Sequence, residues 1–128
     1  MHELGLAEEI VRVADREAAH VGATRVLSVG ITVGQLMQVE VDCLLFLVAI
    51  VGDTSLYTAG AAFEATVEPA RLHCADCGAT WDMGDWVFLC GTCGSTEVRA
   101  LSGERLEVTT MEVELDGDGP RTGGSDRR

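Results

Sequence analysis

Four of the five cysteines follow the pattern C-x2-C-x12-C-x2-C, and this spacing constrains the fold more than any other feature of the chain. The pairs are Cys74 with Cys77 and Cys90 with Cys93. Two residues between cysteines let one tight turn direct both thiolates to a common point, and two facing turns make a tetrahedral cage of four sulfurs. We therefore predict a zinc ribbon over residues 70–100, with these cysteines as the ligands of one structural zinc ion.

A glycine follows each cysteine pair at the same position, Gly78 after the first and Gly94 after the second. Glycine adopts positive φ at little cost, so it allows the turn to wrap backbone N–H groups toward the sulfurs. Metal ligation must supply much of the folding free energy of the insert, because few core side chains remain. These expected core side chains are Trp81, Trp86, Phe88 and Leu89.

Two other chemistries fit paired cysteines: an iron centre, as in a rubredoxin-like electron carrier, and a redox-active dithiol. Colour separates the first from zinc, because ferric thiolates absorb visible light and zinc thiolates do not. Two symmetrical pairs suit a cage better than the single C-x-x-C at a helix start that redox chemistry uses. Four thiolates also leave a metal no open position, so the predicted zinc is not catalytic.

The remaining sequence predicts an α+β fold, a small mixed sheet with two helices, into which the four-cysteine ribbon is inserted. Helical periodicity covers residues 4–19 and 41–51, and strand periodicity covers 24–34, 61–68 and 105–115. We assign residues 1–69 and 101–116 to one α/β domain and residues 70–100 to the zinc-binding insert. Residues 117–128 contain no apolar side chain, so we expect a disordered tail.

The segment 41–51 is apolar nearly all round, which indicates either deep burial or a partner on its second face. A homodimer through this helix is one such arrangement. Within the same helix, Cys43 is interpreted as a small core residue.

Charge and hydropathy exclude several classes of function. The chain has 21 acidic and 9 basic residues, a formal net charge of −12, which disfavours a nucleic-acid partner. Its longest apolar run, residues 43–51, is shorter than the roughly 20 residues of a membrane span. Acidic residues occupy the N-terminal region where a secretory leader carries Lys or Arg, so we expect a cytoplasmic protein. No catalytic triad or phosphate-binding glycine loop is present, so we do not expect an enzyme.

His2 directly follows Met1, and this position has a chemical consequence. The Met1 amine, the His2 amide nitrogen and the His2 imidazole Nδ1 can close adjacent five- and six-membered chelate rings around one metal ion. Such a planar array of nitrogens suits Ni(II) or Cu(II). Glu3 can add an amide nitrogen or a carboxylate. The other two histidines, His20 and His73, are interpreted as surface residues.

Several motifs in order resemble the HypA/HybF family, the nickel metallochaperones of NiFe-hydrogenase maturation. The likeness covers about residues 1–115. It rests on MHE before a helix, SVGITVGQL with Val39-Glu40 after it, Gly60-Ala61, Glu68-Pro69-Ala70, the two C-x-x-C-G pairs and LSGERLEV.

The resemblance implies that His2, with backbone nitrogens at Met1 and Glu3, binds nickel, while the cysteines hold zinc. It also implies that Glu40 completes or neutralises the nickel site. The implied function is delivery of Ni(II) to a hydrogenase large-subunit precursor together with a nickel-handling GTPase. The alternative is a zinc-ribbon adaptor of transcription or replication. Against that alternative, residues 70–100 carry more acidic than basic side chains: Asp76, Asp82, Asp85 and Glu97 against Arg71 and Arg99.

Overall fold

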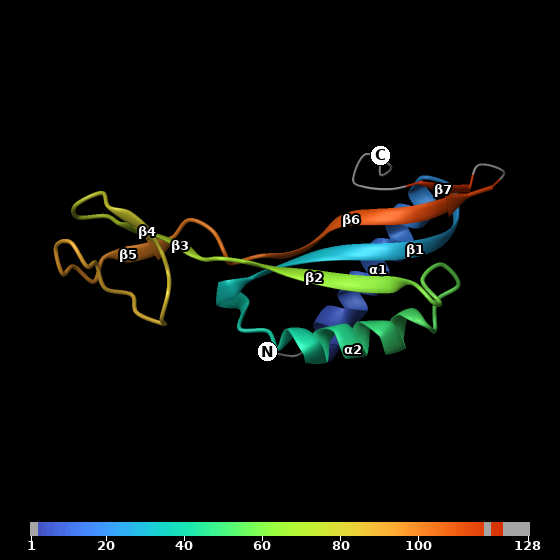
Figure 1. Ribbon diagram of the computed structural model, residues 1–128, viewed down its shortest axis with the longest axis horizontal. Helices are drawn as coiled ribbons and strands as arrows, with labels where there is room; N and C mark the ends of the chain where they lie inside the picture. Colours follow the sequence, from blue (N-terminus) through green and yellow to red (C-terminus); the bar gives the residue numbers. More distant parts are fainter. Residues whose placement is uncertain (1–2, 117–118, 122–128) are drawn as a thin grey trace. The chain divides into compact units, whose positions relative to one another are not determined.

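The computed structural model describes residues 3–116 and 119–121, so Met1 and His2 lie outside the described residues. Within these described residues there are two helices and seven strands, and the strands form two sheets of order β2-β1-β6-β7 and β4-β3-β5 (Figure 1). The helices are α1 (Glu3–His20) and α2 (Val41–Gly52), and η1 (Gln35–Met37) is a 3-10 turn. The strands are β1 (Ala23–Gly34), β2 (Ala62–Glu68), β3 (Arg71–Cys74), β4 (Thr80–Asp82), β5 (Val98–Ala100), β6 (Leu106–Leu115) and β7 (Gly119–Arg121). The predicted α+β class with two helices is confirmed.

The chain divides into two compact units, and each is described by itself. The helix unit comprises the described residues of Met1–Thr32, Val39–Thr66 and Glu107–Arg128. The ribbon unit comprises Val33–Gln38 and Val67–Leu106, so it includes more of the chain than the cysteine region alone. The domain boundaries expected from the sequence stay a prediction.

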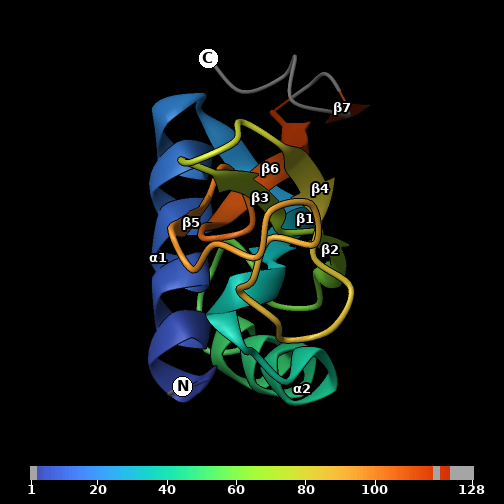
Figure 2. The ribbon, with the colours of Figure 1, turned by 90° about the vertical axis from the view of Figure 1, so that its left-hand side faces the viewer.

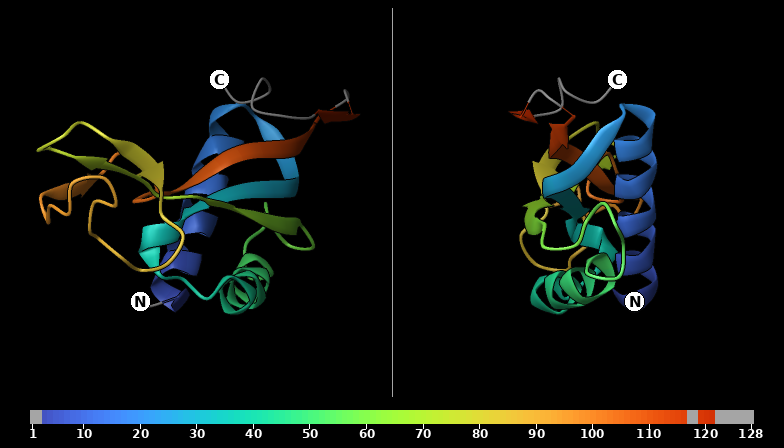
Figure 3. Two further views of the ribbon diagram at one scale, coloured as in Figure 1. Left: turned by 60° about the vertical axis from the view of Figure 1, so that its left-hand side comes forward. Right: turned by 90° about the vertical axis from the view of Figure 1, so that its right-hand side faces the viewer.

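In the helix unit, α1 lies along one face of the larger sheet (Figure 3). Its buried stripe recurs at helical spacing, as the sequence predicted. The stripe consists of Ala7, Ile10, Val11, Ala14 and Ala18. In β1, Val29, Ile31 and Val33 are buried as expected, whereas Leu27 is only half-buried and Val26 is buried instead. The N–H of Val26 donates to the carbonyl of Tyr57 at 2.7 Å, so a loop packs against this end of β1.

The second helix is not deeply buried. Leu44 and Val48 face inward and are fully buried, but Phe46 is 67% exposed and Ile50 is 50% exposed. The prediction that Cys43 is a core residue is wrong, because the side chain is exposed. Since Leu44 and Val48 turn toward the interior, their neighbour Cys43 is rotated to the opposite side of the helix.

The ribbon unit is built on β3, which pairs antiparallel with β4 on one side and β5 on the other (Figure 2). Its core differs from the one expected, because Trp86, Phe88 and Leu89 are 43–49% exposed. Ala70, Leu72 and Met83 are buried instead. Leu72 and Met83 are separated by the first cysteine turn in sequence, so periodicity did not mark them as neighbours. Partly buried side chains pack on this core: Leu36, Trp81, Val98 and Ala100.

Three segments of the ribbon unit cross at a glycine contact. The N–H of Gly34 donates to the carbonyl of Arg105 at 2.7 Å, and the N–H of Ala70 donates to the side-chain oxygen of Gln35 at 2.8 Å. A Cβ at Gly34 would meet the carbonyl oxygen of Gly103 at 2.2 Å. A Cβ at Gly103 would meet the Cα of Ala70 at 2.7 Å. Only glycine therefore permits these backbones to approach so closely.

Residues 119–121 differ from the disordered tail expected of 117–128. They form β7, which pairs antiparallel with β6 through Val113↔Arg121, Glu114↔Pro120 and Leu115↔Gly119. Backbone pairing requires no apolar side chain, so a composition without apolar side chains does not exclude a short strand here. The expectation for 117–118 and 122–128 lies outside the described residues.

We predict that Gly103→Ala lowers the free energy of unfolding of the zinc-loaded protein by about 2 kcal/mol or more, since its φ is +89° and its Cβ has no room. Gly84→Ala is the matched control, because no atom lies within 4 Å of the added Cβ. The control should change stability by less than about 0.5 kcal/mol in denaturant unfolding. Equal effects of the two substitutions would contradict the close crossing.

Candidate metal centre

The four cysteines predicted as ligands converge on one point of the ribbon unit. Their sulfurs all lie within 4.8 Å of one another, and no other group of His, Cys, Asp or Glu among the described residues makes a comparable cluster. Sγ of Cys74 is 3.6 Å from Sγ of Cys93, and Sγ of Cys77 is 3.6 Å from Sγ of Cys90. Each close contact thus joins one cysteine of the first pair to one of the second.

These distances suit a tetrahedral zinc ion. A zinc–sulfur bond is about 2.3 Å long, so a regular tetrahedron of such bonds has sulfurs about 3.8 Å apart. The shortest sulfur separations are close to that value, and they are far longer than the roughly 2.05 Å of a disulfide. The donor set is four soft thiolates in tetrahedral array, which favours zinc or iron over nickel in a square-planar site. The cluster is therefore suited to a structural zinc ion.

The two cysteine turns have the same local structure. The N–H of Gly78 donates to the carbonyl of Cys74 at 2.9 Å, and the N–H of Gly94 donates to the carbonyl of Cys90 at 2.8 Å. Gly78 has φ +80° and Gly94 has φ +76°, which confirms the reason for glycine at these positions. Cys74 ends β3, whereas the second turn has no strand at its start. One cysteine of each pair is buried, Cys74 and Cys90, and the other is exposed.

The pKa values of the cysteine thiols differ from one another because the sulfurs lie so close together. The N–H of Cys93 donates to Sγ of Cys90 at 3.5 Å, and this bond lowers the pKa of Cys90 to about 6. The backbone at Ser95 lowers the pKa of Cys93, but the Cys74 thiol, burial and the other two thiols outweigh it, so this pKa is raised to about 12. Without a cation, ionisation of one thiol thus opposes ionisation of its neighbours.

The pKa of Cys77 is set by a similar balance of opposing effects. A hydrogen bond from the backbone at Ala79 lowers its pKa, but the thiol of Cys90 and burial together raise it above the ordinary value. A bound cation favours the thiolate form of Cys77 and Cys93, because its positive charge offsets the repulsion between neighbouring sulfurs. The chemistry of this cluster therefore couples ionisation of these two thiols to metal binding.

The other predicted site residues lie in the helix unit. Glu3 begins α1 and Glu40 precedes α2, and the structure brings them together: the backbone N–H of Glu40 donates to a carboxylate oxygen of Glu3 at 3.1 Å. The Glu40 carboxylate in turn accepts from the N–H of Asp42 at 3.3 Å, so Glu40 is the N-cap of α2. Met1 and His2 lie outside the described residues. Sequence reasoning did not identify the backbone N–H of Asp42 as a partner of the Glu40 carboxylate.

The two remaining histidines are not in either group. His20 is the last residue of α1 and is exposed. His73 is half-buried in β3, where it pairs with Thr80 and Arg99. It precedes Cys74 in the same strand, so the alternation of side chains along a strand directs the two to opposite faces of the sheet.

Comparison with known proteins gives a consistent result. The family described as "Hydrogenase/urease nickel incorporation, metallochaperone, hypA" matches residues 1–113. The hydrogenase maturation factor HypA of Acidithiobacillus ferrooxidans is 32% identical over 114 residues, covering 89% of this chain and all of the relative. The factor of the same name from Azotobacter chroococcum is 35% identical with the same coverage. The family match includes both helices and both cysteine pairs.

The fold is also similar to solved structures. A solution structure of the Ni metallochaperone HypA from Helicobacter pylori superposes with a TM-score of 0.70 and 18% sequence identity. The alignment covers 90% of this chain and 99% of that one. Among the described residues, no helix has both the length and the apolar character that a membrane crossing needs.

We predict that replacing Cys74, Cys77, Cys90 or Cys93 by Ala releases zinc and unfolds β3–β5, because three thiolates leave the cage open and the small core cannot compensate. Cys43→Ala is the matched control, since it removes an exposed thiol outside the ribbon unit. Elemental analysis gives the zinc content, and backbone hydrogen exchange reports the strands. Stoichiometric zinc in all four variants would refute the assignment.

We further predict that zinc binding to the metal-free chain at pH 7 releases at least the protons of Cys77 and Cys93, whose pKa values are raised. Because protons compete for the same sulfurs, zinc affinity should fall as the pH is lowered from 8 to 6. Calorimetry in buffers of different ionisation enthalpy measures the number of protons released. Zinc binding without proton release would contradict the pattern of pKa values.

Proposed function

The chain belongs to the HypA family of hydrogenase and urease nickel-incorporation metallochaperones, and on that premise we propose that it carries Ni(II) at its N-terminus to a hydrogenase large-subunit precursor. In this proposal the four cysteines hold a permanent zinc ion and nickel is the cargo. The protein binds and releases metal without catalysing a reaction. We place this activity in the cytoplasm, together with a nickel-handling GTPase.

The observation that carries the proposal is the hydrogen bond between Glu40 and Glu3. It fixes the first residue of α1 against the N-terminus of α2, and His2 immediately precedes Glu3 in the sequence. Anchoring residue 3 reduces the conformational freedom of the chain next to His2, which lowers the entropic cost of closing a chelate there. Glu40 and Asp42 add negative charge that favours a divalent cation nearby.

The proposed nickel ligands are the Met1 amine, the His2 amide nitrogen and the His2 imidazole, with Glu3 or Glu40 completing the set. Nitrogen ligands in a plane suit Ni(II), whereas four thiolates suit zinc. The two metals are thus separated by donor chemistry. A terminal site is also open to exchange, while a closed four-thiolate site has no position for an incoming ligand.

The Glu3 carboxylate already accepts a hydrogen bond from the backbone of α2. We therefore assign a positioning role to the side chain of Glu3. The atom of Glu3 that we assign to nickel is its backbone nitrogen. Homodimer formation through the exposed apolar side of α2 stays a prediction. The zinc-ribbon adaptor is not favoured, because the family match extends across both units.

We predict that His2→Ala abolishes stoichiometric nickel binding and hydrogenase maturation, while zinc content and folding are unchanged. A tag fused before Met1 should have the same effect, because it converts the amine to an amide and moves it away from the chain end. His20→Ala is the matched control, since it removes the exposed imidazole of the last residue of α1. Calorimetric titration of each variant with nickel measures its affinity and stoichiometry and so distinguishes the variants. Native affinity in the tagged protein would rule out the terminal site.

Nickel affinity should also fall as the pH drops through about 6.5, where imidazole takes up a proton and ceases to be a ligand. Glu3→Gln should have a small effect, because the amide oxygen still accepts the N–H of Glu40. Glu3→Ala should weaken nickel binding more. Equal losses for the two Glu3 variants would indicate that the carboxylate itself binds nickel.

A further inference from the structure

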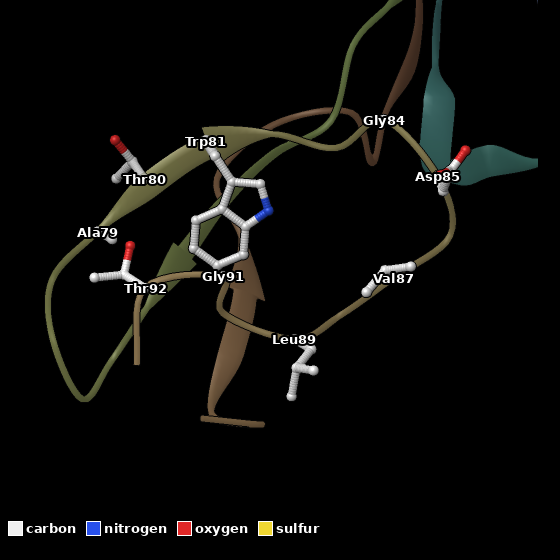
Figure 4. A pocket seen from close by; sticks show the side chains of 9 residues that line it. All are labelled: Ala79, Thr80, Trp81, Gly84, Asp85, Val87, Leu89, Gly91 and Thr92. Carbon is white, nitrogen blue, oxygen red and sulfur yellow. The ribbon is translucent and has the colours of Figure 1, made fainter. Parts of the chain in front are cut away.

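A hollow of about 320 Å³ opens on the ribbon unit, and the proposed metal sites make no use of it. Figure 4 shows the indole of Trp81 at its centre, with Val87 and Leu89 on the opposite side and Thr80 and Thr92 at one end. Its volume is at the lower end of the range of about 300–1,000 Å³ for ligand pockets. It is therefore of a size to receive one large apolar side chain.

One wall of this hollow is a free strand edge. β4 is an outer strand of its sheet, and among the described strands it pairs with β3 alone. The N–H of Cys74 donates to the carbonyl of Ala79 at 2.9 Å, and the N–H of Met83 donates to the carbonyl of Ala70 at 2.8 Å. In an antiparallel ladder, hydrogen-bonded pairs alternate with pairs that are not hydrogen-bonded to each other. Thr80 and Asp82 belong to the second kind, so their backbone N–H and C=O groups point away from β3. An extended chain can therefore pair with this edge.

The opposite wall is an apolar loop that faces solvent. Trp86, Val87, Phe88 and Leu89 are consecutive and are 43–53% exposed. Val87 and Leu89 line the hollow, whereas the rings of Trp86 and Phe88 contact each other with centroids 6.1 Å apart. A small unit that lacks core side chains nevertheless leaves these four outside its core, which marks an interaction surface.

Charge indicates what kind of chain fits here. Asp85 lines the hollow, and its carboxylate makes no hydrogen bond or ion pair with any other residue that the structure describes. Asp82, the last residue of β4, differs from Asp85 because it already forms an ion pair with Arg71 at 2.8 Å. The free carboxylate next to an apolar hollow is complemented by a Lys or Arg adjacent to an apolar residue.

We propose that the edge of β4 and the loop 84–92 form a docking groove for an extended segment of a partner protein. The segment adds a strand to β4, inserts one large apolar side chain over Trp81 and presents a Lys or Arg to Asp85. This inference is independent of nickel binding, since every residue of the groove lies in the ribbon unit.

The chain has two tryptophans: Trp81 lines the hollow and Trp86 belongs to the loop 84–92, so fluorescence reports on the groove directly. In the zinc-loaded, full-length Trp86→Phe variant, Trp81 is the sole tryptophan. The probe is the capped peptide Lys-Thr-Lys-Leu-Lys-Thr-Lys, which contains no aromatic residue. We expect saturable binding that changes the Trp81 emission. Replacing the central Leu of the peptide by Ser should weaken binding at least tenfold, since the apolar side chain is lost.

Matched variants test each part of the groove. Asp85→Asn should weaken peptide binding about threefold, as expected for an exposed charge pair. Glu97→Gln is the control, because it removes an equal charge outside the groove and should leave peptide binding unchanged. Leu89→Asp should abolish binding while zinc content is retained. A peptide with Pro on both sides of Leu should bind weakly, because it cannot donate backbone hydrogen bonds to β4.

Several outcomes would overturn the proposal. One is that a peptide with Glu in place of every Lys binds as tightly as the original peptide. Another is that Asp85→Asn and Glu97→Gln change peptide affinity equally. A third is that no binding is detected at millimolar peptide concentration. A change in Trp81 emission with protein concentration alone, accompanied by a dimer in sedimentation, would assign the groove to a second copy of the chain. An emission change with neutral phospholipid vesicles but not with peptide would assign it to a lipid surface.

Discussion

Convergence of four sulfurs on one cation is the interaction on which the ribbon unit depends. The buried core of that unit is only Ala70, Leu72 and Met83 with partly buried neighbours, and three of its strands are three or four residues long. So small a core supplies little hydrophobic free energy. The thiols of Cys77 and Cys93 also resist ionisation when no cation is present, since their pKa values are raised. Zinc removes that penalty and closes both turns, so folding and metal binding are coupled.

In the proposed function the helix unit meets a different requirement, because the cargo metal that we assign to it must be released. Here a carboxylate of α1 accepts an N–H from the residue that caps α2, and Ser55 donates to Asp15 at 2.7 Å near the other end of the same pair of helices. These contacts hold the start of α1 in place without closing a cage around it. A rigid support beside a chain terminus combines a defined ligand geometry with open access, which suits transfer of a metal to another protein.

The sequence predicted long periodic elements and the cysteine cage well, because both follow local rules. Residues 24–34, 41–51 and 61–68 were expected within one residue of the observed bounds of β1, α2 and β2. The short strands β3, β4 and β5 were not predicted, since three or four residues give too little periodicity. The exposure of Trp86 was missed, and for the helix that carries Phe46 the sequence left burial and an uncovered second face open, because hydropathy shows that a side chain is apolar but not which neighbours cover it. The contact of Glu3 with Glu40 joins residues far apart in sequence, so only the family resemblance indicated it.

The central claim is that two metals occupy sites of different donor chemistry in one chain. X-ray absorption at the zinc and nickel edges of the same sample, prepared with a native N-terminus and one equivalent of nickel, tests this most directly. The account predicts four sulfur neighbours at about 2.3 Å around zinc, and only nitrogen and oxygen neighbours around nickel. Sulfur in the nickel shell, or loss of sulfur from the zinc shell when nickel is added, would show that nickel enters the cysteine cage and would contradict the account.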